Sequence, residues 1–397
     1  MTNEQRWPRT DPSDVTRTAD EPGARSAWRI ATSGLIAAVC LVIAAVPPVD
    51  AAEKTAAGGV DAHAEKTPKS IVDRKMFRLE FDNDIFFGSD DAFSAGWSFQ
   101  LHSRMMDQWN PGFAGWIGKV PGLGDDGHGG RVVRFAVTLS QIMVTPNDIT
   151  IEAPQPNDAP WAGLLGATGT WSSYDNRRLA ALQVYLGCMG PCSQVEDVQK
   201  FVHNQLGAGD DPVGWGNQLS NQALGNVNYE YKYKVFEAAP ERHAFHRFAN
   251  DFAVGGQVGA GTLDTFVRGS LEYRFGWGMP MGFTKVPDPP GIGTVLDPVY
   301  FDPKQPVPDT AHWSYVFNVI VRGAWIGYLA PAEGGETESG YNHPELDAPG
   351  TFEALAGFHV VRVPFGFHLT FFHNLNDPDP DIESSMDWAN FSFEYRF

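Results

Sequence analysis

This chain has no apolar run of about eighteen residues after Ala52, the length that a membrane-spanning helix needs. It is also poor in positive charge, with 29 Lys and Arg against 48 Asp and Glu and a formal net charge of −19. No stripe of Lys and Arg interrupts this balance, so no nucleic-acid partner is expected. No internal repeat is evident, which argues against solenoids and propellers.

Cysteine is scarce, with three residues in the chain. Cys40 lies in an expected leader segment, while Cys188 and Cys192 flank a Met-Gly-Pro turn. In an oxidising compartment these two could form a tight disulfide. A zinc site would need two further ligands, and none is arranged nearby. A disulfide and two free thiols both remain open on the sequence alone.

The N-terminal region has the pattern of a secretory signal. Arg25 and Arg29 precede an apolar run from Leu35 to Val46, and prolines and small residues follow. This pattern predicts a signal over residues 1–52, with cleavage near Ala51 or Ala52. A single-span anchor is the alternative, but the twelve residues from Leu35 to Val46 are few for crossing a bilayer.

The polar stretch before Arg25 is long for a signal peptide, which indicates either a start site assigned too early or an extended signal. Residues 53–70 are rich in Ala, Gly, Lys and Asp and are interpreted as a flexible lead-in. Residues 71–397 then remain as a single folded domain.

The C-terminal residues alternate strictly between aromatic and polar side chains. Phe391, Phe393, Tyr395 and Phe397 are separated by Ser392, Glu394 and Arg396. A final amphipathic strand that ends on an aromatic residue is typical of bacterial outer-membrane barrels, whose last strand closes the sheet.

Three other segments show the same alternation, with one aromatic or aliphatic face and one polar or small face, as lipid-facing and lumen-facing positions require. The sequence therefore predicts an all-β fold, a transmembrane antiparallel β-barrel of the bacterial outer membrane. The three rows are Val227, Tyr229, Tyr231, Tyr233 and Val235; Leu271, Tyr273, Phe275 and Trp277; and Val361, Val363, Phe365, Phe367, Leu369 and Phe371.

A cluster of polar residues lies between two predicted strands near the start of this domain. The segment Glu80 to Gly96 contains the carboxylates of residues 82, 84, 90 and 91, together with Asn83 and Ser94. Two adjacent strands would bring Asp84 and Ser94 to one end of a hairpin. The simpler interpretation of such a segment is an acidic, solvated hairpin loop.

One segment has helical rather than strand periodicity. Ser193 and Glu196 form a capping-box pattern, and Val195, Val198, Val202 and Leu206 recur at helical spacing up to Gly207. The expected helix, residues 193–206, is not needed to close a barrel, so it is expected to pack on the wall or to cap the mouth.

The predicted helix carries His203. A single histidine on a helix is most often structural or solvated, but here it accompanies a carboxylate and amide cluster, as in a general-base hydrolase. Oxygen ligands such as Asp84 and Asn83 suit a hard divalent cation that polarises an ester carbonyl. Ser94 could orient the substrate or act as a nucleophile activated by His203.

Four segments in order resemble the outer-membrane lipid A 3′-O-deacylase (LpxR) family, over roughly residues 77–235, whereas the remainder is similar only in strand pattern. The resemblance implies a barrel of about twelve strands with a short helix packed near the extracellular side. The segments are Phe81-Asp82-Asn83-Asp84; Asp90 with Phe93-Ser94-Ala95-Gly96; Asn157-Asp158-Ala159-Pro160-Trp161-Ala162-Gly163; and Gly190-Pro191 through Gln199 to His203 and Gly214-Trp215-Gly216-Asn217-Gln218-Leu219.

The resemblance also implies an activity: hydrolysis of the 3′-linked acyloxyacyl chain of lipid A in lipopolysaccharide, with Ca²⁺ as cofactor. The site residues of the family fall on Asn83, Asp84, Ser94 and His203, with His203 as general base. Asp84 and its neighbour Asn83 would bind the metal. Ser94 takes the place of a threonine and keeps the hydroxyl.

Several positions depart from the family pattern. Ala159 stands where an arginine is expected, and no Lys or Arg lies between Ile149 and Pro156 to pair with a lipid A phosphate. Gly209 replaces a glutamate, and Asn221-Gln222 replaces Asn-Glu. The catalytic groups therefore match the family, while headgroup recognition is expected to differ. The alternatives are a different acylated lipid, a non-catalytic barrel (pore or structural), or an outer-membrane phospholipase with a Ser-His pair.

Overall fold

The structure is a computed structural model that describes residues 74–83, 95–109, 115–124, 131–175, 177–206, 211–238, 248–280, 282–284, 313–346, 350–375 and 387–397. The expected signal peptide (1–52) and lead-in (53–70) lie outside these residues, as do Asp84 and Ser94 of the predicted site. No helix in the described part of the chain is both long and apolar enough to span a membrane.

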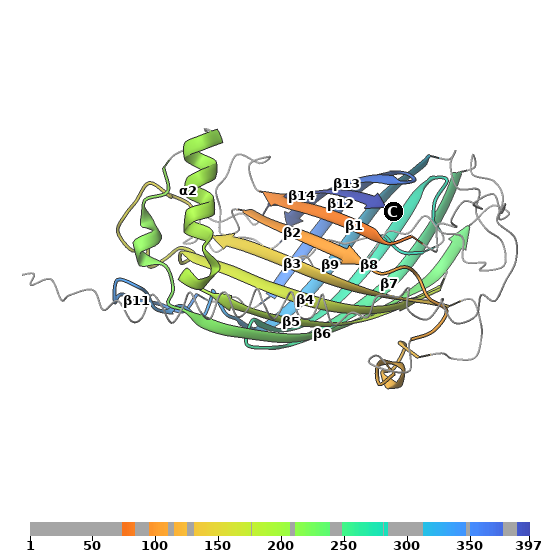
Figure 1. The fold of residues 1–397 in the computed structure, drawn as a ribbon, viewed down its shortest axis with the longest axis horizontal. Coiled ribbons are helices and arrows are strands. Elements are labelled where there is room, and N and C mark those ends of the chain that lie inside the picture. The colour runs from red at the N-terminus through yellow and green to blue at the C-terminus, as the bar shows by residue number, and fades with distance from the viewer. Residues whose placement is uncertain are drawn as a thin grey trace, which may run out of the picture. The chain divides into compact units, whose positions relative to one another are not determined.

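Twelve strands of the described chain form one closed antiparallel barrel (Figure 1). The first and last strands pair from Met76–Arg396 to Asn83–Ala389, which closes the sheet. Closure leaves no unpaired strand edge, as a hydrocarbon environment requires. The predicted barrel and its closure by the final strand are confirmed. The wall consists of β1 (Met76–Asn83), β2 (Ala95–His102), β3 (Val132–Val144), β4 (Ala162–Tyr174), β5 (Arg178–Met189), β6 (Gln222–Ala238), β7 (Phe248–Gly261), β8 (Asp264–Trp277), β9 (Ser314–Leu329), β12 (Gly350–Arg362), β13 (Phe365–Asn374) and β14 (Trp388–Arg396).

The outer face carries the predicted aromatic rows. In β14, Phe391 and Tyr395 are exposed, whereas Ser392 and Glu394 between them are buried. Strands β6 and β8 show the same alternation of outer and inner residues. Period-two patterning therefore identified correctly which face of these strands meets lipid.

The predicted row from Val361 to Phe371 is not a single strand. Strand β12 ends at Arg362 and β13 begins at Phe365, so the row is divided by a tight turn. Pro364 lies in this turn because it has no N–H to donate to a strand ladder. Val361, on the far side of the turn, is buried rather than lipid-facing.

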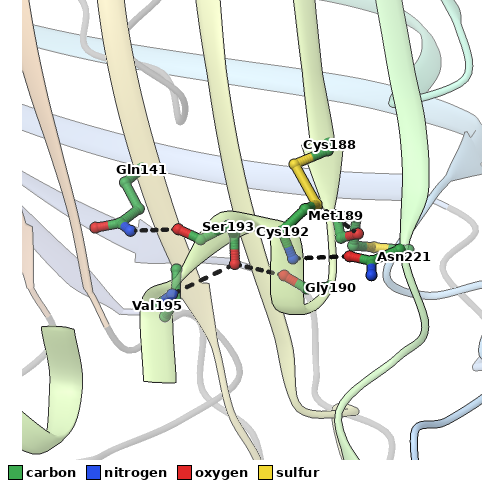
Figure 2. Close-up of a disulfide and its surroundings, with 8 residues drawn as sticks. All are labelled: Gln141, Cys188, Met189, Gly190, Cys192, Ser193, Val195 and Asn221. Atoms are coloured by element: carbon green, nitrogen blue, oxygen red, sulfur yellow. Dashed lines mark hydrogen bonds between the residues drawn. A yellow bond between two sulfur atoms is a disulfide. The ribbon is translucent and has the colours of Figure 1, made fainter. Parts of the chain in front are cut away.

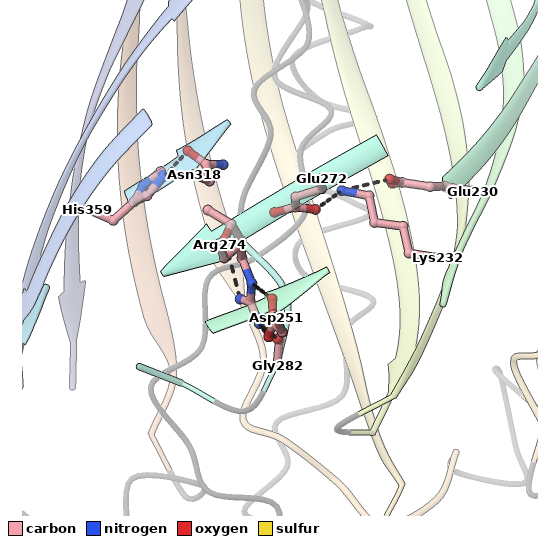
Figure 3. A network of polar contacts seen from close by, with 9 residues as sticks. Glu230, Lys232, Asp251, Glu272, Arg274, Gly282, Asn318 and His359 are labelled. Atoms are coloured by element: carbon pink, nitrogen blue, oxygen red, sulfur yellow. Dashed lines mark hydrogen bonds and ion pairs between the residues drawn. The ribbon is translucent and has the colours of Figure 1, made fainter. Parts of the chain in front are cut away.

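Charged side chains form a network inside the barrel (Figure 3). Asp251 receives a hydrogen bond from Arg274 Nε at 2.8 Å and an ion pair from Lys234 at 3.0 Å, and all three are at most 1% exposed. A second pair joins Lys232 to Glu272 at 3.2 Å. Buried charges need such partners, because a charge left unpaired in a water-poor interior is costly.

Short helical segments and a two-stranded hairpin lie at the two ends of the wall. The 3-10 helix η4 (Ile117–Lys119) follows β2 and packs, through the buried Ile117, against the outward-facing Val133. At the opposite end lie η5 (Pro191–Ser193), α2 (Val195–Leu206) and η6 (Gly214–Asn217), together with the pair β10 (Gly335–Glu336) and β11 (Asn342–His343). Figure 1 shows α2 beside the ends of β3 to β5.

The predicted helix is confirmed, but its expected capping box is wrong. Ser193 belongs to η5, and its hydroxyl donates to the carbonyl of Gly190 at 2.6 Å. The first helical bond runs from Val198 N–H to the carbonyl of Gln194 at 3.4 Å. Glu196 pairs instead with Lys200, four residues further along α2, at 2.5 Å. The Pro-initiated 3-10 turn displaces the helix start by two residues.

Candidate active site on the outer wall

The candidate site begins with one row of residues that face one another across neighbouring strands. Asn83 on β1 pairs with Ala95 on β2, Ala95 with Met143 on β3, and Met143 with Gly163 on β4. This row lies at the end of the barrel that carries α2. The structure thus places the backbone of the predicted site residue Asn83 in the same row as the wall positions that α2 covers.

Helix α2 and its neighbours pack against the outside of this part of the wall. Val195, at the start of α2, forms a buried apolar cluster with Ile149, Trp161 and Trp215, and Met143 of β3 packs against it. Gly163 makes this close approach possible, because a Cβ there would lie 2.1 Å from Ser193 Oγ. We refer to η5, α2, η6, Ile149 and Trp161 together as the α2 layer.

A hydrogen bond between two buried side chains fixes the rotation of α2. The indole N–H of Trp215 donates to Gln199 Oε1 at 2.6 Å, and the two residues are 1% and 4% exposed. Trp161 meets Trp215 edge-on, with 4.9 Å between ring centroids. Gly214 permits this contact, since a Cβ there would lie 2.4 Å from Trp161 Nε1. His203 follows Gln199 by about one helical turn and is partly buried.

The disulfide left open by the sequence is present between Cys188 and Cys192 (Figure 2). It joins the end of β5 to η5, and thus to the start of α2. The backbone N–H of Cys192 also donates to Asn221 Oδ1 at 2.7 Å, just before β6. The N-terminus of α2 is therefore attached covalently to one wall strand and by a hydrogen bond to the next.

The β10–β11 pair binds to the segment that follows α2. Gln218 Nε2 donates to Glu338 Oε2 at 3.3 Å, and Ser339 Oγ donates to Asn217 Oδ1 at 2.6 Å. Partial burial, the largest cause, raises the pKa of the Glu338 carboxyl; the Gln218 hydrogen bond opposes this and the charge of Glu196 adds to it. These contacts join regions far apart in the sequence, and no local pattern indicated them.

The residue just before Ala159, where the family pattern expects an arginine, has a structural role here. Asp158 accepts hydrogen bonds from the N–H groups of Asn147 and Ala159, at 2.8 and 2.7 Å, and so stabilises the loop before β4. Ala159 is 8% exposed. Both oxygens of the Asp158 carboxylate therefore accept hydrogen bonds from backbone groups of its own loop.

Of the four predicted site residues, the structure describes His203 fully and Asn83 in its backbone, whereas Asp84 and Ser94 lie outside the described residues. Within the described residues, no group of three or more His, Cys, Asp or Glu side chains is arranged to hold a metal. The donor set expected for a cation, Asn83 with Asp84, therefore includes one residue beyond that part of the chain.

Comparison with known proteins identifies relatives of this barrel. The family model of outer membrane protein LpxR matches residues 35–397. Among solved structures, LpxR from Salmonella typhimurium aligns with a TM-score of 0.61 and 12% identity, covering 81% of this chain and 100% of that one. This likeness shows the fold.

Other outer-membrane barrels align less well. The β domain of the Bordetella autotransporter BrkA matches at a TM-score of 0.38 and 8% identity, over 81% of this chain and 97% of that one. An outer-membrane channel from Pseudomonas putida F1 matches at 0.34 and 9%, over 85% and 100%. No curated protein sequence matches. The family match shows that this chain belongs to the LpxR family. Together with the closed twelve-stranded wall, it shows a β-barrel of the bacterial outer membrane.

Proposed function

We propose that this protein is an outer-membrane esterase that removes the 3′-linked acyloxyacyl chain of lipid A. The observation that carries the proposal is the packing of the start of α2, the helix that contains His203, against the outer face of the wall at the row of Asn83. A site on the outer face is open to substrates that diffuse within the membrane. Family membership supports the same substrate class.

The wall below this row offers a surface for acyl chains. Phe81 is 48% exposed and Phe99 44% exposed, and both lie on the outer face of β1 and β2. Apolar side chains of this kind are compatible with lipid tails. A lipid A molecule lying in the outer leaflet would place its chains along these residues and its ester bonds near the α2 layer.

In the proposed reaction, His203 accepts a proton from water as that water attacks the ester carbonyl carbon. The bond between the acyl carbon and the sugar oxygen then breaks. The imidazolium gives its proton to the sugar alkoxide as it leaves. The Ser94 hydroxyl orients the ester by a hydrogen bond. Asp84 and Asn83 offer oxygen donors of the type that calcium prefers, and a bound Ca²⁺ would supply polarisation of the carbonyl.

The pore alternative has less support. Paired charges such as Asp251 with Arg274 occupy the described interior, and Arg274 also donates to the carbonyl of Gly282 at 2.5 Å, holding the segment 282–284 inside the barrel end. Phe283 in this segment is 1% exposed. The phospholipase alternative predicts that Ser94 reacts with a serine-directed fluorophosphonate, whereas water attack predicts no labelling and inhibition by a chelator.

The test is mass spectrometry of lipid A after incubation with detergent-purified protein and calcium. We expect loss of one acyloxyacyl unit, and no loss with a chelator or with His203→Ala. The matched control is His373→Ala, which removes a histidine from the exposed end of β13 and should leave the product unchanged. Lipid A that remains intact with the unmodified protein would refute the proposal.

A further inference from the structure

We propose that Gln141 is a positioning residue, which sets α2 and its His203 against the β1–β2 edge of the site. This inference rests on the proposed function for its catalytic consequence. Its physical basis, a bridge formed by one side chain between two elements of the site, is independent of the substrate.

Gln141 is out of place in its row on β3. The outward-facing residues before it are Val133, Phe135, Val137 and Leu139, all apolar as a lipid-facing row should be. An amide in this row would be costly if it faced hydrocarbon, since its polar groups would lack partners. Gln141 is only 5% exposed, because the α2 layer covers it.

Both polar groups of the Gln141 side chain bind partners on different elements. Trp97 Nε1 on β2 donates to Gln141 Oε1 at 2.7 Å. Gln141 Nε2 donates to the carbonyl oxygen of Ser193 at 2.7 Å, the bond drawn in Figure 2. An indole N–H can only donate and a carbonyl can only accept, so the two partners determine the orientation of the amide. An isosteric apolar residue could make neither bond.

The bridge reaches a strand that the other attachments of α2 do not. The disulfide joins η5 to β5, and the Cys192–Asn221 bond joins it to the start of β6. Trp97 lies on β2, three residues after Ser94 in the sequence. Among the described contacts, Gln141 is therefore the link between the α2 layer and the strand that follows the predicted Asp84–Ser94 loop.

The test compares Gln141→Leu, Trp97→Phe and the double variant by hydrogen exchange of the α2 amides and by kcat and KM on lipid A. We expect Gln141→Leu to raise α2 exchange about tenfold, as for one or two lost hydrogen bonds. We expect kcat to fall by about tenfold or more with little change in KM, because the chemistry depends on placement. Trp97→Phe should add little in the double variant, since both changes break the same bridge.

Leu139→Ala is the matched control, from the same outward row of β3, and should leave α2 exchange unchanged. Unchanged α2 exchange in Gln141→Leu would overturn the proposal whatever the activity. Faster exchange with unchanged kcat would also overturn it, because the bridge would then serve stability alone. If the unmodified protein leaves lipid A intact, the proposed function fails, and the exchange ratio by itself decides whether Gln141 holds α2.

Discussion

The interior of the barrel contains buried charged pairs among its polar contacts, whereas the buried polar contacts described for the α2 layer join amides, indoles and backbone carbonyls. Asp251 with Arg274 represents the first kind, and Trp215 with Gln199 the second. Both regions are buried. Charged pairs are costly to break, because each leaves an unpaired charge behind, while a neutral hydrogen bond is worth far less.

This difference suggests a division of roles. The interior contacts join strands of a closed wall to one another, so disturbing them disturbs the whole barrel. Apart from the disulfide at its start, the α2 layer rests on one side of the wall through a small apolar cluster and a few neutral hydrogen bonds. Local opening of such a layer requires less free energy than unfolding the barrel, as is common for elements that take part in function.

The largest expected effect comes from breaking the interior. Asp251→Ala leaves the buried Arg274 and Lys234 without their shared carboxylate and should lower the free energy of unfolding by about 3–5 kcal/mol. Denaturant unfolding in detergent, followed by tryptophan fluorescence, measures this change. The exposed Glu345→Ala should stay within about 0.5 kcal/mol. A loss below about 1 kcal/mol for Asp251→Ala would show that interior water replaces the Asp251 carboxylate as the partner of Arg274 and Lys234. The energetic contrast between the interior and the α2 layer would then be wrong.

The interior could be predicted from sequence in part. Alternation along β14 correctly placed Glu394 and Arg396 inside. Arg78, the partner of Glu394 across the closure, could not be identified, because it is 316 residues from Glu394 and meets it only when β1 and β14 close the barrel, at 2.9 Å. The two-residue alternation specifies which face of a strand a residue occupies. Which residues of β1 and β14 face each other depends instead on how the whole sheet closes.

The α2 layer was less predictable. The helical spacing of its valines predicted α2, and packing on the wall was one of the two positions expected for it. The role of His203 stays a prediction. The capping box failed because Pro191 starts a 3-10 turn first. Gln141 did leave a signal, a polar residue in an apolar row, but interpreting it required knowing what covers that row. The Gln218–Glu338 bond spans 120 residues and left no local signal.

A second prediction targets the α2 layer while sparing the interior. Gly163→Val adds a side chain at a position where even a Cβ would lie 2.7 Å from Val195 Cβ. The α2 layer must therefore move outward. We expect a local penalty of about 1–3 kcal/mol, seen as faster hydrogen exchange in α2 and loss of deacylation. The unfolding transition of the barrel should change little.

Gly269→Val is the matched control, because a Cβ there meets nothing within 4 Å. It should leave α2 exchange and activity as they are. If Gly163→Val shifted barrel unfolding as far as Asp251→Ala does, the α2 layer and the barrel would be one cooperative unit, and the proposed division of roles would be wrong.

The smallest expected effect concerns Glu338, a charged residue of the β10–β11 hairpin that contacts Gln218 just after η6. Because burial raises the pKa of Glu338, the folded protein holds that proton more tightly than the unfolded chain. The stabilisation is therefore present below the ordinary pKa and is lost as pH rises through the folded pKa. The effect should stay below about 1 kcal/mol, because the side chain is only partly buried and solvent screens its charge.

Glu338→Gln keeps a neutral partner for Gln218 at every pH, so its α2 layer should not loosen as pH rises through this range. Hydrogen exchange of α2, corrected for the intrinsic pH dependence of exchange, would compare the two proteins from about pH 4 to about pH 8. Glu336→Gln, on the same hairpin and exposed, should follow the unmodified protein. Parallel curves for Glu338→Gln and the unmodified protein would mean that ionisation of Glu338 does not loosen α2, because the other contacts of the β10–β11 pair, such as Ser339 with Asn217, and the wall contacts of Gln141 and Gly163 would then hold the layer at every pH.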